Sequence, residues 1–172
     1  NCGETKATLS VSVKDRRTVT LSVHALRDVA GHQTRRQPSE AIGLVREMNE
    51  RIFVNQANLE LNLRMNRWVT APRNLGDVDR FSAHLIRVRA RQHEWDDVIA
   101  LGDSGADVNL FLVWVYEQDA TPYQNEAQGG TISTDCLVED SADLVTTAGH
   151  EIAHALGLDH ATETTRLTSL LD

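Results

Sequence analysis

Two histidines and a glutamate near the C-terminal end of the chain have the spacing of a metal-binding pair with a catalytic partner. His150 and His154 are four residues apart, and Glu151 directly follows the first of them. In an α-helix of about 3.6 residues per turn, positions i and i+4 lie one above the other on one face. The two imidazoles can therefore converge on one ion, with the Glu151 carboxylate beside them and not itself a ligand.

A third ligand is required, because catalytic zinc sites take three protein ligands and keep one position open. Gly157 and His160 follow in the order that such a site needs. Glycine tolerates the left-handed backbone that ends a helix. We expect Gly157 to turn the chain sharply and to bring His160 back toward His150 and His154, which completes a site for one Zn²⁺.

A zinc ion bound in this way favours hydrolysis. It would lower the pKa of its bound water from about 15.7 to roughly 7 and would polarise a carbonyl group. Glu151 would act as general base on the zinc-bound water and would pass the proton to the departing amine. Peptide bonds are the natural substrate of this chemistry.

The alternative interpretation is that these histidines are solvated or hydrogen-bonded on an amphipathic helix. A bare His-Glu-x-x-His pattern occurs by chance in many helices. The addition of Gly157 and His160 makes the pattern far more specific, because the alternative does not account for three imidazoles and a carboxylate at these offsets.

The helix that carries these residues is predicted to begin near Asp140 or Ser141, either of which can be its N-cap, and to end at Gly157. Its apolar residues recur at helical spacing and form one face. They are Leu144, Val145, Ala148, Ile152, Ala153 and Leu156.

A second helix and a strand are predicted earlier in the chain. Pro38-Ser39 offers a helix start with Ser39 as N-cap, and apolar residues at helical spacing continue to about residue 56. Residues 59–65 alternate between apolar and polar side chains without a break. This alternation predicts a strand with one face on the core and the other in water.

The N-terminal and central segments give weaker patterns. Alternation at residues 9–13 and 19–23 predicts two strands that could form a hairpin. Residues 71–77 have the composition of a loop, and Phe81, Leu85 and Val88 indicate a short helix.

Two further strands are expected before the metal-binding helix. After a turn at residues 102–105, residues 106–116 are rich in apolar and aromatic side chains, which predicts a strand buried on both faces. Residues 117–130 are polar and contain glycine, and they are expected to form a loop that leads into a short edge strand at 131–134.

The composition is that of a globular protein, with 41% hydrophobic and 24% charged residues. At 172 residues we expect a single domain over residues 1–172. The net charge of −8, with basic residues scattered among acidic ones, argues against nucleic acid as a partner. No stretch approaches the roughly 18 consecutive apolar residues of a membrane span, so no transmembrane segment is expected.

The chain begins at Asn1, with no initiator methionine and no basic-then-apolar leader. We expect any export signal to have been processed or to lie outside this sequence, and the protein to be secreted or otherwise extracytoplasmic. Cys2 and Cys136 leave three alternatives open: a disulfide between them, two free thiols, or a functional thiol at Cys2 that masks a metal or carries lipid.

Residues 150–160 resemble the extended zinc-binding motif of the metzincin metalloproteases, His-Glu-x-x-His-x-x-Gly-x-x-His, over all eleven positions. The ending Gly157-Leu158-Asp159-His160 is similar to that of matrixins in particular. Residues 105–108, which lead into an apolar strand, are similar to the matrixin strand that precedes the substrate-binding edge.

The resemblance implies an α+β fold, in which a twisted mixed β-sheet packs on two long helices and the active-site helix carries the zinc motif. It also implies that substrate lies extended along an edge strand above the metal, where it adds a strand to the sheet. Residues 129–134 are the candidate for that strand. One catalytic Zn²⁺ is the cofactor that the family uses.

The sequence departs from the family in two ways. A metzincin carries a methionine in a tight turn beneath the ligands, whereas Thr168 stands there in this chain and no methionine follows Met65. Only twelve residues follow His160, where the family has a longer C-terminal part that walls the specificity pocket. Leu167, Leu170 and Leu171 are candidates for a rudimentary wall.

Several residues outside the eleven-residue motif could serve as ligands or have structural roles. The acidic pairs Asp77/Asp79 and Asp103/Asp107 are candidates for a Ca²⁺ site of the kind that metzincins often have, although neither pair has a full ligand count. The remaining histidines are expected to have surface or core roles, and the three tryptophans are expected to pack in the core or at its edge. These residues are His24, His32, His84, His93, Trp68, Trp95 and Trp114.

These observations predict a zinc-dependent metalloendopeptidase that acts on a peptide or protein substrate. Two alternatives remain. One is a catalytically weak zinc-binding domain used for partner recognition, and the other is an exopeptidase or a peptidase restricted to one partner protein. Glu151 favours the enzyme, because a purely structural zinc site has no need of a base.

Overall fold

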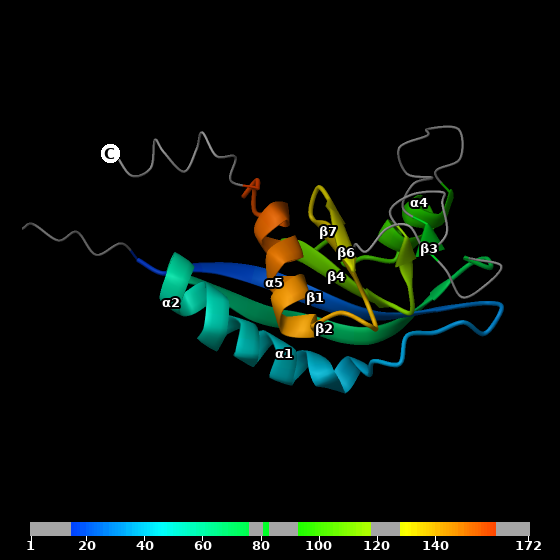
Figure 1. Ribbon diagram of the computed structural model, residues 1–172, viewed down its shortest axis with the longest axis horizontal. Helices are drawn as coiled ribbons and strands as arrows, with labels where there is room; N and C mark the ends of the chain where they lie inside the picture. The colour runs from blue at the N-terminus through cyan, green and yellow to red at the C-terminus, as the bar shows by residue number, and fades with distance from the viewer. Residues whose placement is uncertain (1–14, 76–80, 83–92, 118–127, 161–172) are drawn as a thin grey trace, which may run out of the picture.

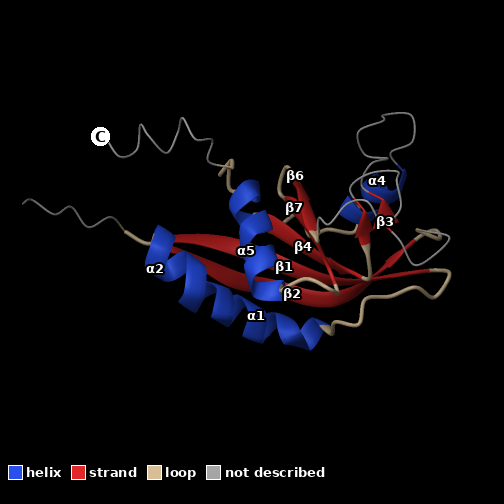
Figure 2. Cartoon of the chain, viewed as in Figure 1, coloured by secondary structure: helices blue, strands red, loops and turns tan. Residues whose placement is uncertain are grey.

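The computed structural model describes residues 15–75, 81–82, 93–117 and 128–160. Its centre is a five-stranded sheet with the strand order β2-β1-β4-β7-β6 (Figures 1 and 2). These strands are β1 Arg17–Asp28, β2 Leu59–Ala71, β4 Val108–Val113, β6 Gly129–Ile132 and β7 Asp135–Glu139. A smaller pair joins β3 Phe81–Ser82 to β5 Tyr116–Glu117 in parallel. The expectation of a mixed sheet combined with helices is confirmed.

Four of the five strands run parallel to one another, and β6 alone is antiparallel to its neighbour. Parallel neighbours need a crossover between them, and the helical segment between β1 and β2 provides it. The predicted strand at 19–23 is therefore part of β1, which pairs with β2. Residues 9–13, the other half of the expected hairpin, lie outside the described residues.

The predicted helix over 39–56 occurs as four consecutive helical segments. They are the 3₁₀ turn Pro38–Glu40, α1 Ala41–Met48, the π-helical stretch Asn49–Phe53 and α2 Val54–Ala57. The expected N-cap at Ser39 is wrong by two residues, because Gln37 occupies that position and its N–H donates to the Glu40 carboxylate at 3.3 Å. Asn58, with φ of 49°, ends the helix.

The π-helical stretch is tied to the neighbouring strand through Asn49. The Asn49 side chain donates to the carbonyl oxygen of Leu61 at 2.9 Å and accepts from the N–H of the same residue at 2.8 Å. It therefore bonds to the backbone of β2 as a neighbouring strand would. The extra residue in a helical turn, which defines π-helical geometry, coincides with this attachment.

The two faces of the sheet are covered differently. One face carries Val19, Leu21, Leu110 and Val138 and packs on α1 and on α5 Leu144–Ala155. The other face carries Leu26, Phe111 and Leu137 and packs on α4 His93–Ile99 and on Trp114. Figure 1 shows α1 and α5 together on one side of the long strands, with α4 away from them.

The central strand β4 is buried at all six positions, which confirms the prediction of a strand buried on both faces. Two other predictions need correction. Phe81 and Ser82 form β3, where a helix was expected, and the rest of that segment lies outside the described residues. The strand at 59–65 is real but continues to Ala71.

The strand β7 was not predicted, because its apolar core is only three residues long and follows directly on a hairpin turn. Cys136, Leu137 and Val138 are nonetheless fully buried between β4 and β6. In the described part of the chain, no helix is both long enough and apolar enough to cross a membrane.

Candidate metal centre

The site is built on α5, which begins later than predicted. Asp143 is the N-cap and accepts from the N–H of Thr146 at 3.3 Å, so the predicted start at Asp140 or Ser141 is wrong. Asp140 has another role: its carboxylate accepts from the Thr34 hydroxyl and from the N–H of Arg35. This contact attaches the loop after β1 to the segment that leads into α5.

Close packing sets the position of α5. At Gly149 the helix lies directly against the Cδ1 atom of Ile52, so that even a methyl group at residue 149 would collide with it. A glycine at this point lets the α5 backbone approach the helical segment between β1 and β2. The apolar side chains Ala148 and Ile152, both fully buried, anchor the same side of α5 in the core.

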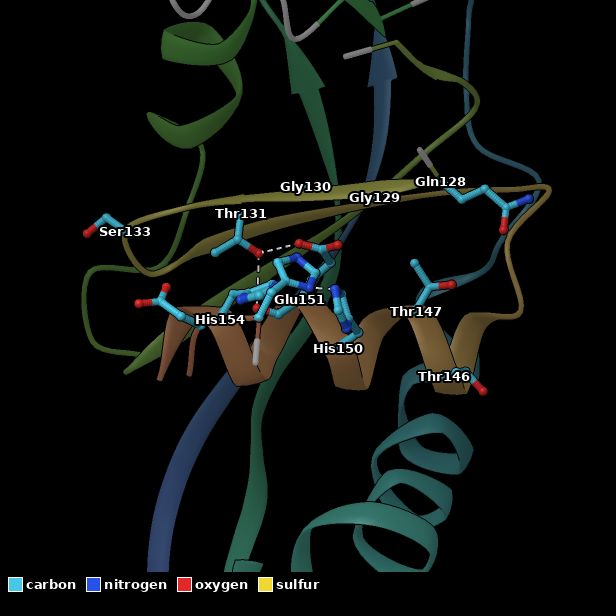
Figure 3. A pocket seen from close by; sticks show the side chains of 12 residues that line it. Gln128, Gly129, Gly130, Thr131, Ser133, Thr146, Thr147, His150, Glu151 and His154 are labelled. Carbon is cyan, nitrogen blue, oxygen red and sulfur yellow. Dashed lines mark hydrogen bonds between the residues drawn. The ribbon is translucent and has the colours of Figure 1, made fainter. Parts of the chain in front are cut away.

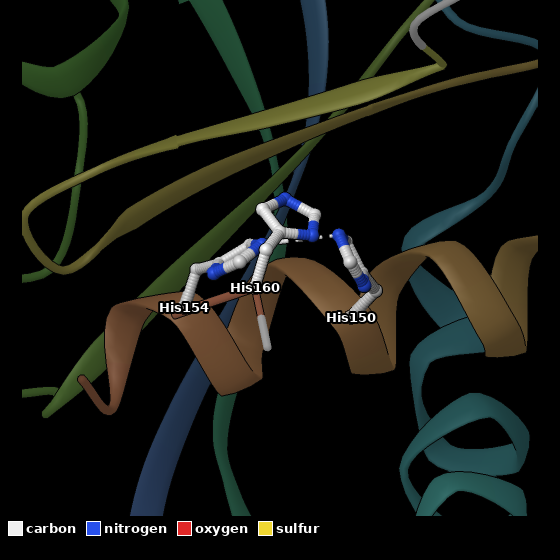
Figure 4. Close-up of side chains that lie close together, drawn as sticks. All are labelled: His150, His154 and His160. Atoms are coloured by element: carbon white, nitrogen blue, oxygen red, sulfur yellow. Dashed lines mark hydrogen bonds between the residues drawn. The ribbon is translucent and has the colours of Figure 1, made fainter. Parts of the chain in front are cut away.

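The three predicted ligands meet on the opposite side of α5 (Figure 4). One nitrogen from each of His150, His154 and His160 lies within 4.8 Å of the others, and the Nε2 atoms of His150 and His154 are 3.0 Å apart. Two of the rings are exposed and His154 is half-buried. The cluster therefore faces a solvent-accessible space, as a site that admits substrate must.

The turn that returns His160 to the helix is closed by backbone hydrogen bonds. Gly157 has φ of +91°, and its N–H donates to the carbonyl oxygen of His154 at 2.9 Å. The N–H of Leu158 donates to the carbonyl oxygen of Ala153 at 3.0 Å. Together these bonds form a Schellman motif, in which glycine adopts the left-handed conformation at low cost. The predicted role of Gly157 agrees with this geometry.

The same turn orients one of the imidazoles. His154 Nδ1 lies 2.5 Å from the carbonyl oxygen of Leu158. A carbonyl oxygen only accepts, so Nδ1 carries a proton and Nε2 is the nitrogen that faces the cluster. This is the arrangement by which a second hydrogen bond fixes the tautomer of a metal-ligating histidine.

Glu151 lies one residue from the first ligand and is buried, with 7% of its surface exposed. Its Oε2 atom accepts from the hydroxyl of Thr131 at 2.6 Å, and the same hydroxyl lies 3.0 Å from the Glu151 carbonyl oxygen (Figure 3). The edge strand β6 therefore contacts the carboxylate directly. Sequence reasoning missed Thr131, since nothing in a one-dimensional pattern places residue 131 beside residue 151.

A cavity of about 830 Å³ opens between β6 and α5. Its walls include all three histidines and Glu151 from the α5 side and the strand residues from Gly129 to Thr131 from the other side (Figure 3). The expected edge strand at 131–134 is confirmed as an edge strand but runs from Gly129 to Ile132, because Ser133, with φ of 57°, begins the turn to β7.

The donor set fits a zinc ion. Three imidazoles are a set used by catalytic zinc, and Zn–N bonds of about 2.0–2.1 Å in a tetrahedron separate the nitrogens by roughly 3.3–3.4 Å. The 3.0 Å between His150 and His154 needs to widen by a few tenths of an ångström, and the rest of the cluster, which spans up to 4.8 Å, needs to close around the ion. Among the described residues, these three histidines form the one cluster of metal-binding side chains.

The acidic pair proposed for calcium is engaged within the protein. Asp103 accepts from the Ser22 hydroxyl, from Arg64 and from the N–H of Gly105, and these donors, led by Gly105, hold its pKa at about 2. Asp107 accepts from both the N–H and the hydroxyl of Thr20. Nothing in the structure supports a calcium site there, and Asp77 and Asp79 lie outside the described residues.

The other histidines and tryptophans that can be described have the structural roles expected of them. His24 is fully buried and stacks on Phe111, and His32 lies 2.8 Å from the Asp28 carboxylate. Trp114 is buried, and Trp68 lies under the Arg27 guanidinium at 5.9 Å. The remaining members of the set fall outside what the structure describes, namely His84 and the side chains of His93 and Trp95.

Cys136 is a free thiol, fully buried against the Thr131 hydroxyl at 3.6 Å, and burial raises its pKa to about 12. Cys136 forms no disulfide among the described residues, and Cys2 lies outside them, so the pairing of the two cysteines stays a prediction. Thr168 and the leucines expected to wall the pocket also lie outside them, so the predictions about the missing methionine and the short C-terminal part stay predictions.

No protein-family model matches the chain, and no curated protein sequence matches it. Among solved structures, the chain is similar to archaemetzincin from Methanopyrus kandleri, with a TM-score of 0.54 and 18% identity over 84% of this chain and 77% of that chain. This similarity shows a shared, zincin-like fold. A structure of a chaperone–substrate complex also matches, over 88% of this chain and 25% of that chain at 14% identity, but its TM-score of 0.45 carries no argument.

Proposed function

We propose that this protein is a zinc metalloendopeptidase. The observation that carries the proposal is the convergence of His150, His154 and His160 in a cavity that also holds the Glu151 carboxylate and is bordered by an edge strand. The likeness to archaemetzincin supports the fold that this function requires. The chemistry is argued from the site alone.

The three histidines would hold the ion through one nitrogen each. Zinc supplies Lewis-acid chemistry when bound, since it makes water more acidic and polarises a carbonyl group. The hydrogen bond from His154 Nδ1 to the Leu158 carbonyl keeps that ring in the tautomer and orientation that a ligand needs. His150 and His160 are exposed, which leaves the open side of the site to water and substrate.

Glu151 is the group that moves protons. It takes the proton from the attacking water and delivers it to the amine that leaves when the peptide bond breaks. Its position one residue after His150 places it on the cavity wall. The side chain is buried, so the side of Glu151 that faces β6 is closed to bulk water. A carboxylate in this position has no role in a purely structural zinc site.

The edge strand β6 is the surface that we propose binds the substrate backbone. It pairs with β7 on one side and lies at the end of the sheet, so its other side can accept an extended peptide as an additional strand. Neither Gly129 nor Gly130 has room for a side chain. A side chain at residue 129 would meet Glu151, and one at residue 130 would meet the ring of Tyr116.

Cleavage of a mixed peptide library by the zinc-loaded protein tests the proposal. We expect cleavage at internal peptide bonds, abolished by a zinc chelator and by Glu151→Gln, a substitution that keeps the size of the side chain and removes the base. Cleavage confined to chain ends would indicate an exopeptidase. No cleavage by a protein that holds one zinc ion would contradict the proposal and favour a zinc-binding domain that recognises a partner.

A further inference from the structure

We propose that Thr131 is a positioning residue that holds the Glu151 carboxylate in its working orientation, and this inference rests on the proposed function. The contact joins the strand β6 to the helix α5. Thr131 Oγ1 lies 2.6 Å from Glu151 Oε2, the shortest of the contacts that this hydroxyl makes. No other hydrogen bond to the carboxylate is found among the described residues.

The chemistry of the hydroxyl fits this role. A threonine hydroxyl has one proton to donate, and an ionised carboxylate is an acceptor only. A hydrogen bond to a charged oxygen is shorter and stronger than one to a neutral oxygen, which agrees with 2.6 Å to the carboxylate against 3.0 Å to the backbone carbonyl of Glu151. The proton therefore points at Oε2, and the carboxylate group is fixed by that oxygen.

The same strand leaves no room for a side chain beside Glu151 at Gly129. A Cβ atom at Gly129 would lie 3.1 Å from Glu151 Cγ and 2.9 Å from the carbonyl oxygen of Leu137. Side chains two residues apart on a strand point to the same face, so Gly129 and Thr131 both face α5. Gly129 limits the space beside the aliphatic part of the Glu151 side chain, and Thr131 fixes the position of its carboxylate.

The hydrogen bond from Thr131 connects the proposed substrate-binding strand to the proposed base. A glutamate has several rotatable bonds, and the order that β6 imposes on them removes freedom that the side chain would otherwise keep. Loss of this order should lower kcat, because a misplacement of about 1 Å in a reacting group can cost up to about 100-fold in rate. Substrate affinity should change little, because β6 is proposed to bind substrate through its backbone, which a change of the Thr131 side chain leaves in place.

The test compares three zinc-loaded variants with the wild type. Thr131→Val keeps the shape and the β-branch of the side chain but removes the hydroxyl, and Thr131→Ser restores the hydroxyl. Thr18→Val makes the same chemical change at an exposed position of β1, far in sequence from the residues that line the cavity. For Thr131→Val we expect kcat to fall about tenfold with KM within about twofold of the wild type. Thr131→Ser should recover most of the loss, and Thr18→Val should match the wild type.

Crystal structures of the same proteins give a readout that does not depend on activity. We expect the Glu151 carboxylate to leave its single position in Thr131→Val and to keep it in Thr131→Ser, with zinc bound in both. An unchanged carboxylate position in Thr131→Val, or an unchanged kcat, would overturn the inference. If the wild type holds zinc and cleaves nothing, the proposed function fails, and the carboxylate position in Thr131→Val still decides whether Thr131 holds Glu151.

Discussion

His154 Nδ1 donates to the carbonyl oxygen of Leu158 across the turn that ends α5. The turn thus has two effects on the histidine cluster: it orients the His154 ring through Leu158 and returns His160 to the cluster. Both effects depend on the left-handed conformation of Gly157, with φ of +91°. The geometry of the cluster is therefore sensitive to the backbone at a residue that is not one of the three histidines.

Gly157→Ala should weaken both folding and zinc binding. A residue with a Cβ atom in the left-handed region costs about 1–2 kcal/mol, and relief of that strain would move His160 away from its partners. We expect the free energy of unfolding of the metal-free protein to fall by about that amount, and zinc affinity to fall by up to about tenfold. Chemical denaturation and a competitive zinc titration measure the two effects.

Gly31 provides the matched control for this variant. It has φ of +97° and, like Gly157, has open space where a Cβ atom would be. Gly31→Ala should lose similar stability and keep the zinc affinity of the wild type. Equal losses of zinc affinity in both variants would contradict a specific role for the turn at Gly157.

The packing of Gly149 on Ile52 predicts a coupled pair of mutations. Gly149→Ala places a methyl group against Ile52 Cδ1, and Ile52→Val removes that atom. Overpacking costs typically about 1–3 kcal/mol, and Ile→Val alone costs about 0.5–1.5 kcal/mol. We expect Ile52→Val to be less destabilising in the Gly149→Ala background than in the wild type. A double-mutant cycle of unfolding free energies measures this coupling, and simple additivity would contradict the contact.

Buried His24 predicts a loss of stability in mild acid. Its Nε2 atom donates to Asn109 Oδ1 at 3.0 Å, whereas Nδ1 has no hydrogen-bond partner among the described residues. Burial lowers the pKa of His24 below the ordinary 6.5, so the unfolded chain takes up this proton at a higher pH than the folded chain. The contribution of His24 to the free energy of unfolding is therefore complete above pH 6.5. It declines as the pH falls toward the pKa of His24 in the folded protein.

Thermal unfolding of the wild type and of His24→Gln between pH 8 and pH 5 checks this prediction. Glutamine can still donate to Asn109 but does not titrate. The difference in Tm between the two proteins should be constant above about pH 6.5 and should move in favour of the variant below it. A difference in Tm that stays constant across the whole range would show that His24 does not contribute to the loss of stability in acid.

Local periodicity predicted the elements whose pattern repeats over several turns or residues. The helix over 39–56, the strand that begins at Leu59 and the buried strand β4 belong to this group. The convergence of the three histidines was also readable, because residues four apart on a helix, followed by a glycine turn, define a local geometry. Such features need no knowledge of distant contacts.

Features set by distant contacts were not predictable. Asp140, Ser141 and Asp143 are all good N-caps by residue type, but Asp140 is engaged by Thr34, more than a hundred residues earlier, and Ser141 donates to Glu139, which leaves Asp143 as the cap. The strand β7 was missed because its burial depends on β4 and β6 lying on either side of it. The contact of Thr131 with Glu151 likewise exists only in three dimensions.

The most direct test of the account is the zinc content of the purified protein after dialysis, measured by mass spectrometry of the metal for the wild type, His160→Ala and Glu151→Gln. We predict about one zinc per chain in the wild type and in Glu151→Gln, since Glu151 is not a ligand, and a marked loss in His160→Ala. A His160→Ala variant that keeps full zinc content, or a wild type that retains none, would contradict the proposal that these three histidines form the metal centre.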